Sequence, residues 1–167
     1  MIERDAFPVD ADVDLHVPAE RVELRPSPVP VLAAISAGGV CGALARYGLA
    51  LAWPHDPGGF PWSTFLTNVS GCFLIGVLMV FVTEVFAGRR LLRPFLGVGV
   101  LGGFTTFSTY VVDIQRAAAA GAPWVALAYL AVTLVGALLA VWAGSAATAA
   151  VVRRWAGRGA ETAGVAR

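Results

Sequence analysis

GGFTTFSTY, residues 102–110, lies inside a long apolar stretch of the chain and combines two glycines with four serine or threonine hydroxyls and three aromatic rings. Glycine weakens a helix, and the β-branched threonines lose side-chain freedom in one. The stretch therefore predicts an interrupted helix, in which Gly102 and Gly103 permit a non-helical backbone and a threonine caps the helix that restarts. Inside a membrane, the backbone groups released by such a break must face protein, water or an ion.

The composition places this stretch in a membrane. The 167-residue chain is 57 % hydrophobic and 14 % charged, which is too little polar surface to coat a water-soluble domain. A formal net charge of +1 argues against nucleic-acid binding, which requires a basic surface. The two cysteines, Cys41 and Cys72, both lie in apolar segments and are interpreted as small hydrophobic residues.

Four apolar runs, 30–53, 60–87, 91–117 and 122–152, are each long enough to cross a bilayer. Turn-like or charged links separate them, so neighbouring helices are expected to be antiparallel. The sequence thus predicts an all-α membrane protein with four transmembrane helices in residues 29–152. Residues 1–28 are acidic and punctuated by proline, which predicts a disordered tail, and residues 153–167 are expected to form a flexible C-terminal tail.

Four crossings place both termini on one side of the membrane. Most of the arginines near the helix ends fall on that side: Arg21, Arg25, Arg89, Arg90, Arg93, Arg153, Arg154 and Arg158. The opposite side has Arg116 and Arg46. The positive-inside rule therefore predicts cytoplasmic termini and a strong bias toward one orientation.

Polar residues within the apolar runs are costly and each calls for a reason. Arg46 either extends to the headgroup region or supplies positive charge at a pore vestibule. Asn68 either joins two helices by hydrogen bonds or offers its amide protons to an anion. Asp113 is expected to pair with Arg116, three residues later on the same helix. His55, in a predicted loop, is given no role beyond that of a loop residue.

Two further features bear on a polar path. Tyr129 and Thr133 are four residues apart and share one face of the fourth predicted helix. Thr133 taken alone proves little, because a threonine hydroxyl can bond the carbonyl four residues before it. Phe104, Phe107 and Tyr110 are spaced by three, and aromatic edges carry partial positive charge suited to an anion. Packing is the alternative interpretation of this aromatic stripe.

Three motifs together resemble the signatures of the Fluc/CrcB fluoride channels. They are GALARY (42–47), TFLTNVSGCFLIG (64–76) and GGFTTFSTY (102–110), in matching order and spacing. The likeness extends over residues 31–152. It implies fluoride-selective passive efflux through the bacterial plasma membrane, conferring fluoride resistance, with no enzymatic activity.

The resemblance also implies an assembly and a set of site residues. Two subunits would pack antiparallel as a dual-topology dimer, with two pores and a broken third helix in each subunit. A structural Na⁺ at the dimer centre would be held by main-chain carbonyls of Gly102 and Thr105. The residues matching the family's pore, polar track and vestibule are Asn68, Phe107, Tyr110, Ser108, Thr109, Tyr129, Thr133 and Arg46.

Three positions depart from the family pattern. Tyr110 stands where phenylalanine is usual, so its hydroxyl is expected either to bond fluoride or to obstruct it. Cys72 replaces a serine, and Asp113 replaces a glutamate that is one carbon longer. The orientation bias adds the expectation that the working partner is either a second copy or an oppositely oriented homologue.

Two other readings remain open at this stage. A small multidrug-type transporter would require a carboxylate in the first membrane helix, where this chain has Arg46. A non-transporting assembly subunit would use Asn68 and the glycines for packing alone.

Overall fold

The computed structural model describes residues 29–84 and 91–165, and this part of the chain is helical. Its elements are α2 (Val29–Ala52), α3 (Trp62–Glu84), the π-helical η1 (Arg93–Leu101), α4 (Gly102–Phe104), α5 (Phe107–Ala119) and α6 (Pro123–Val165). Four stretches of the described chain are long and apolar enough to cross a membrane: Val29–Ala52, Trp62–Thr83, Arg93–Ala119 and Pro123–Trp155. The prediction of four membrane helices is confirmed. The tail predicted for residues 1–28 lies outside the described residues.

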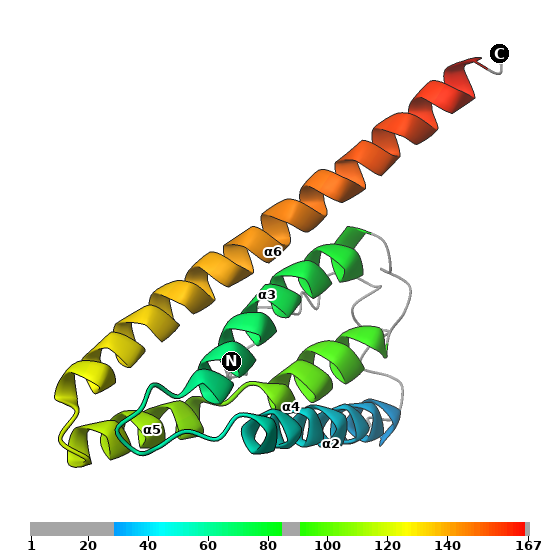
Figure 1. Ribbon diagram of the computed structural model, residues 1–167. Helices are drawn as coiled ribbons and strands as arrows, with labels where there is room; N and C mark the ends of the chain where they lie inside the picture. The colour runs from blue at the N-terminus through cyan, green and yellow to red at the C-terminus, as the bar shows by residue number, and fades with distance from the viewer. Residues whose placement is uncertain (1–28, 85–90, 166–167) are drawn as a thin grey trace, which may run out of the picture. The chain divides into compact units, whose positions relative to one another are not determined.

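The last helix is longer than the sequence predicts. α6 contains 43 residues and continues ten residues beyond the apolar span that ends at Trp155. At ~1.5 Å per residue this corresponds to about 65 Å, roughly twice the thickness of a bilayer's hydrocarbon core. Figure 1 shows α6 running past the end of α3. The helix thus includes residues 153–165, while the flexibility expected of that segment stays a prediction.

The third apolar span is where the backbone leaves helical geometry. Thr105 (φ −75°, ψ 157°) and Thr106 (φ −151°, ψ 120°) are extended between α4 and α5. Gly102, in contrast, has helical angles (φ −64°, ψ −37°) and begins α4. The prediction that the two glycines supply the non-helical backbone is therefore wrong, because the two threonines that follow them supply it.

The glycines instead allow backbones to approach one another. A Cβ on Gly103 would overlap the carbonyl oxygen of Gly39, and one on Gly42 would overlap the carbonyl oxygen of Val100. Gly38 meets the backbone of η1 in the same way. Small residues at helix interfaces of membrane proteins permit this contact, which replaces the hydrophobic driving force that lipid cannot supply.

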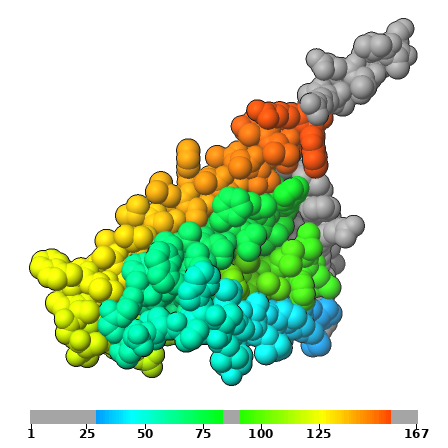
Figure 2. All heavy atoms as spheres, viewed as in Figure 1, coloured from blue at the N-terminus to red at the C-terminus, as the bar shows by residue number. Residues whose placement is uncertain are grey.

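α3 and α6 are joined by the same device. The two helices lie side by side in Figure 1, and on the face drawn in Figure 2 α3 lies between α6 and α2. A Cβ on Gly76 would overlap the carbonyl of Val141, and one on Gly144 would overlap that of Phe73. Gly38, Gly42 and Gly76 are thus all sites of close helix packing.

A tight turn sets the antiparallel course of α5 and α6. Gly121 has a positive φ of 77° and its N–H bonds the carbonyl of Ala118, while the Ala122 N–H bonds that of Ala117. This pair of bonds is a Schellman motif, which uses glycine for its left-handed residue. Pro123 follows as the first residue of α6, where its missing N–H costs no helical bond.

We expect Gly42→Ala to lower the melting temperature in detergent, because the added methyl group meets the fixed Val100 carbonyl. Over-packing of this kind costs ~1–3 kcal/mol. Gly48→Ala, on the same helix with nothing within 4 Å of its Cβ, is the matched control. It should be neutral or slightly stabilising, since alanine favours helix. Equal melting temperatures for the two variants would contradict the proposed contact.

Candidate functional site

Asn68 bridges α3 and the interruption of the third span. Its Oδ1 accepts a hydrogen bond from the Thr106 N–H at 2.8 Å, and its Nδ2 donates to the Thr106 carbonyl at 2.9 Å. The side-chain amide therefore pairs with both backbone groups of one residue, as a neighbouring strand would. Of the two interpretations left open for Asn68, the structure shows the one in which it joins two segments by hydrogen bonds. The second N–H of Nδ2 takes no part in this pairing with Thr106.

The side chains around the break also determine which carbonyls lose their helical donors. In a continuous helix the amides of Thr106 and Thr109 would bond the carbonyls of Gly102 and Thr105. Here the Thr106 N–H is donated to Asn68, and the Thr109 N–H is donated to the Thr106 hydroxyl at 3.2 Å. The predicted capping of a restarted helix by a threonine is confirmed at Thr106. Gly102 and Thr105, the two residues expected to hold a cation, are thus among the residues at the break whose carbonyls lose the donor of a continuous helix.

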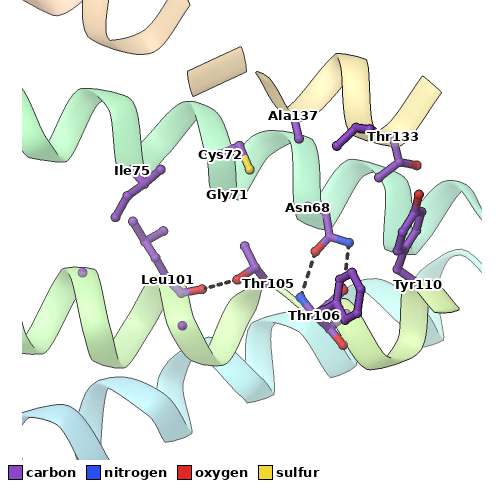
Figure 3. Close-up of a pocket in the computed structure, with 14 residues that line it drawn as sticks. Asn68, Gly71, Cys72, Ile75, Leu101, Thr105, Thr106, Tyr110, Thr133 and Ala137 are labelled. Carbon is purple, nitrogen blue, oxygen red and sulfur yellow. Dashed lines mark hydrogen bonds between the residues drawn. The ribbon is translucent and has the colours of Figure 1, made fainter. Parts of the chain in front are cut away.

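A cavity of about 430 Å³ opens at this break (Figure 3). α3, η1, α4, α5 and α6 all contribute to its wall. Six of the residues singled out from the sequence line it: Asn68, Gly102, Thr105, Phe107, Tyr110 and Thr133. Cys72 lines it too. The fold therefore brings together residues from sequence positions 68 to 133.

Two buried hydroxyls of α6, of which that of Thr133 belongs to a residue lining this cavity, have no hydrogen-bond partner among the described residues. Tyr129 is fully buried and Thr133 is 5 % exposed, yet neither the Tyr129 Oη nor the Thr133 Oγ1 is bonded. Elsewhere the membrane helices satisfy such hydroxyls locally: Ser70, Thr83, Thr105, Ser145 and Thr148 each donate to the carbonyl four residues before them. Thr133 departs from this pattern, although buried hydroxyls in proteins are nearly always bonded to protein or to ordered water.

The aromatic residues form a short row. The Phe107 and Tyr110 rings are 6.0 Å apart, and the Tyr110 ring meets Tyr129 at 5.2 Å in an edge-on arrangement. Phe107 is 78 % exposed in the single chain. The Tyr110 hydroxyl donates to the Leu130 carbonyl of α6 at 2.8 Å. This bond ties the extra hydroxyl of Tyr110 to the neighbouring helix.

A second cavity, of about 210 Å³, lies between α2, α3 and the start of α5. Arg46 lines it, with its Nε donating to the Gly103 carbonyl at 3.2 Å. The remaining polar lining consists of hydroxyl groups: Tyr47, Ser63, Thr64, Thr67, Thr106 and Thr109. Arg46 and Thr109 thus belong to this cavity and not to the larger one, whereas Thr106 borders both. Ser108, exposed at the start of α5, approaches the Thr106 hydroxyl at 3.4 Å.

Sequence reasoning missed the hydroxyl row on α3. Ser63, Thr64 and Thr67 are all buried, and their spacing of one, three and four residues places them on one helical face. That spacing is the feature of the sequence from which a polar face on this helix could have been predicted. His55 was missed as well: its Nε2 lies 3.9 Å from the Asp113 carboxylate. The expected pair of Asp113 with Arg116 is confirmed at 3.9 Å.

We expect Asn68→Ala to destabilise the chain strongly, since it leaves the N–H and the carbonyl of Thr106 unpaired inside the membrane. Each orphaned group costs ~1–3 kcal/mol. Ser70→Ala, two residues away on α3, removes only a bond within the helix and should have little effect. Thermal unfolding in detergent compares the two. If the Asn68→Ala variant is as stable as Ser70→Ala, the pairing of Asn68 with Thr106 does not contribute to the stability of the fold.

The chain resembles known proteins over most of its length. Residues 33–145 match the family model described as CrcB-like protein, Camphor Resistance (CrcB). A Streptomyces avermitilis protein named Fluoride-specific ion channel FluC 2 is 55 % identical over 122 residues, covering 73 % of this chain and 77 % of the relative. A Nocardia farcinica protein of the same name is 51 % identical over 142 residues, covering 85 % and 96 %. One from Thermobifida fusca is 56 % identical over 129 residues, covering 77 % and 96 %. By both the extent of the family match and these identities, the chain is a multi-pass membrane protein that belongs to the CrcB family.

Proposed function

We propose that this chain forms a fluoride-selective channel for passive efflux of fluoride across the bacterial plasma membrane. Its relatives are named fluoride-specific ion channels. The observation that carries the proposal here is the pair of buried, unbonded hydroxyls of Tyr129 and Thr133. Thr133 lines the cavity at the break, and Tyr129 meets the Tyr110 ring that lines it, so an anion there would find protein donors in exchange for water.

The chemistry of fluoride fits these groups. A small anion holds its water tightly, and moving it into a low-dielectric interior requires hydrogen-bond donors to replace that water. Selectivity arises when the pore supplies such donors at close quarters without binding the ion too tightly. Neutral hydroxyls meet both conditions, because they donate without adding a full positive charge. Tyr129 and Thr133, one turn apart on α6, offer two successive donors.

The other members of the proposed path differ in chemistry. Arg46, with Thr109 in the smaller cavity, raises the local concentration of anions at a vestibule. Phe107 and Tyr110 present aromatic edges beside the larger cavity. Asn68 retains one amide proton after pairing with Thr106, and Ser108 lies at the start of α5. In this scheme Tyr110 lines the path with its ring, since its hydroxyl is engaged by Leu130.

The proposed assembly is an antiparallel dimer in which two broken third helices cross. The extended backbone of Thr105 and Thr106 supports the break. The exposure of Phe107 and the open cavity beside it support a partner, since a second copy would cover both. Because the arginine distribution favours one orientation, an oppositely oriented homologue is the alternative partner. Curated relatives numbered FluC 2 and FluC 3 in Streptomyces avermitilis are consistent with more than one such chain in a cell.

A structural Na⁺ fits the released carbonyls. Gly102 is exposed on the single chain, and both Gly102 and Thr105 border the larger cavity. Backbone carbonyl oxygens are the ligands that hard monovalent cations accept in membrane proteins. With one such pair from each subunit, the ion would hold the two breaks together at the dimer centre. The Na⁺ ion would have a structural role, and it would be bound by other groups than the hydroxyls that contact the anion.

Two other functions are less well supported. A small multidrug-type transporter is opposed by α2, whose described residues include Arg46 and no carboxylate. A non-transporting assembly subunit would account for the glycine contacts and for Asn68. It gives no reason for two unbonded hydroxyls at Tyr129 and Thr133.

The function is tested by fluoride efflux from liposomes that contain the purified chain, with chloride as the control ion. We expect fluoride-selective flux that falls about tenfold or more in Thr133→Val, since a hydrogen bond to an ion contributes ~1.5–3 kcal/mol. Thr148→Val is the matched control, because Thr148 is also buried on α6 but bonds its own helix. Equal loss in both variants would oppose the assigned path. Absence of flux from the folded native chain, restored by co-reconstitution with an opposite-topology homologue, would assign the heterodimer.

The sodium site is tested through stability. We expect the melting temperature in detergent to rise with Na⁺ concentration, because a ligand bound only by the folded state stabilises it in proportion to the logarithm of its excess over Kd. N-methyl-D-glucamine at the same ionic strength is the control, since it is too large to enter a carbonyl cage. A melting temperature that depends on ionic strength alone would contradict the site.

A further inference from the structure

A buried carboxylate lies beside the proposed vestibule. Asp113 is 2 % exposed, and its Oδ2 accepts a hydrogen bond from the Thr64 hydroxyl at 2.7 Å. Two basic groups approach its other oxygen: the His55 Nε2 and the Arg116 Nη1 each lie 3.9 Å from Oδ1. The chain thus buries an acid in the membrane domain and places basic groups on one side of it, with a hydroxyl on the other.

This carboxylate is close to two parts of the anion path. Thr64, its hydrogen-bond donor, lines the 210 Å³ cavity with Arg46. Tyr129, one of the two unbonded hydroxyls, lies within electrostatic range of Asp113. A buried negative charge there opposes the entry of an anion, because little water screens it. The single O–H of Thr64 is also donated to Asp113 and so is withheld from the cavity.

The two basic groups differ in how well they offset this charge. Arg116 is 64 % exposed, so solvent and salt weaken its effect on Asp113. His55 is 23 % exposed and approaches from the loop between α2 and α3. The other charged group in that part of the loop is Asp56, which is exposed and acidic. His55 is therefore the better shielded of the two groups, and its charge depends on pH.

The charge of this cluster changes with the protonation of one residue. With His55 neutral, Asp113 and Arg116 sum to zero; with His55 protonated, the sum is +1. Histidine is the side chain that ordinarily gains its proton between pH ~8 and ~5. Acidification thus makes the vestibule more positive, and an added positive charge at a narrow entrance raises the entry rate of anions.

We propose that His55 is a positioning residue which, through its contact with Asp113, makes fluoride flux increase on acidification. This inference rests on the proposed channel function. In the neutral form the imidazole leaves the Asp113 charge opposed only by the solvent-exposed Arg116. In the protonated form it draws the carboxylate into an ion pair, which lowers the electrostatic cost for an anion in the cavity. The device would raise efflux under acidic conditions.

The first experiment measures fluoride flux from liposomes at pH 8, 7 and 6, with protein-free liposomes at each pH to subtract leak of the neutral acid. We expect a rise of roughly threefold to tenfold between pH 8 and 6, at the low end of the rate effects that local charge produces. His55→Gln should give the same flux at all three values, since glutamine keeps a polar side chain and has no proton to gain. His16→Gln, the matched control with the other histidine changed, should keep the native rise.

Several outcomes would overturn the proposal. Flux that is independent of pH in the native chain would do so while leaving the channel function intact. A rise that persists in His55→Gln would assign the pH effect to another group. Fluoride flux from none of the variants would count against the proposed function of the single chain, and a second measurement then decides the inference separately.

That second measurement needs no transport. Carbethoxylation of His55 by diethyl pyrocarbonate is followed by mass spectrometry in the native chain and in Asp113→Asn, with His16 in the same chain normalising the reagent. We expect His55 to react several-fold faster in Asp113→Asn, because the carboxylate no longer holds and protects the imidazole. Equal normalised rates would show that Asp113 does not hold His55, and the proposal would fail whatever the flux.

Discussion

The pairing of the Asn68 amide with both backbone groups of Thr106 is the interaction on which the rest of the site depends. A membrane offers no water to an interrupted helix, so each released N–H and carbonyl needs a partner within the protein. Asn68 supplies both partners from α3, and Thr106 in turn caps α5 with its hydroxyl. The break is thereby stable, and the carbonyls of Gly102 and Thr105 are left without the amides a continuous helix would give them. The cavity lining and the proposed cation site both follow from this arrangement.

Close backbone contact holds the break in position. Glycines on α2, η1 and α4 bring their backbones together where a single methyl group would clash, and Gly76 with Gly144 does the same for α3 and α6. Such contacts fix the distance between helices more firmly than flexible side chains would. Thr133 on α6 and Asn68 on α3 then line the same cavity.

The sequence predicted the four membrane helices and most of the polar residues at the site, because apolar length and costly polar groups leave clear local signals. It expected non-helical backbone at Gly102 and Gly103, whereas the extended residues are Thr105 and Thr106. The conformational freedom of glycine predicts extended backbone at the glycines themselves. The residue that stabilises the extended backbone of Thr106 is Asn68, which lies 38 residues away in the sequence. The sequence also did not predict the burial of Thr64 or the approach of His55 to Asp113. Both depend on how helices far apart in the sequence pack against one another. Thr133 shows the reverse case, since only the structure reveals that its hydroxyl does not bond its own helix.

The self-sufficiency of the break has a consequence for how the protein is made. The Thr105 hydroxyl bonds the Leu101 carbonyl, and both backbone groups of Thr106 bond the Asn68 side chain, without a second subunit. A newly inserted chain can therefore complete this part of its fold before any partner arrives, in whichever direction it entered the bilayer. For the proposed dimer, biogenesis would then separate into insertion of individual subunits and their later encounter by lateral diffusion. In that proposed dimer, the abundance of each orientation, set when the chain is inserted, would limit how many complete assemblies a cell can form.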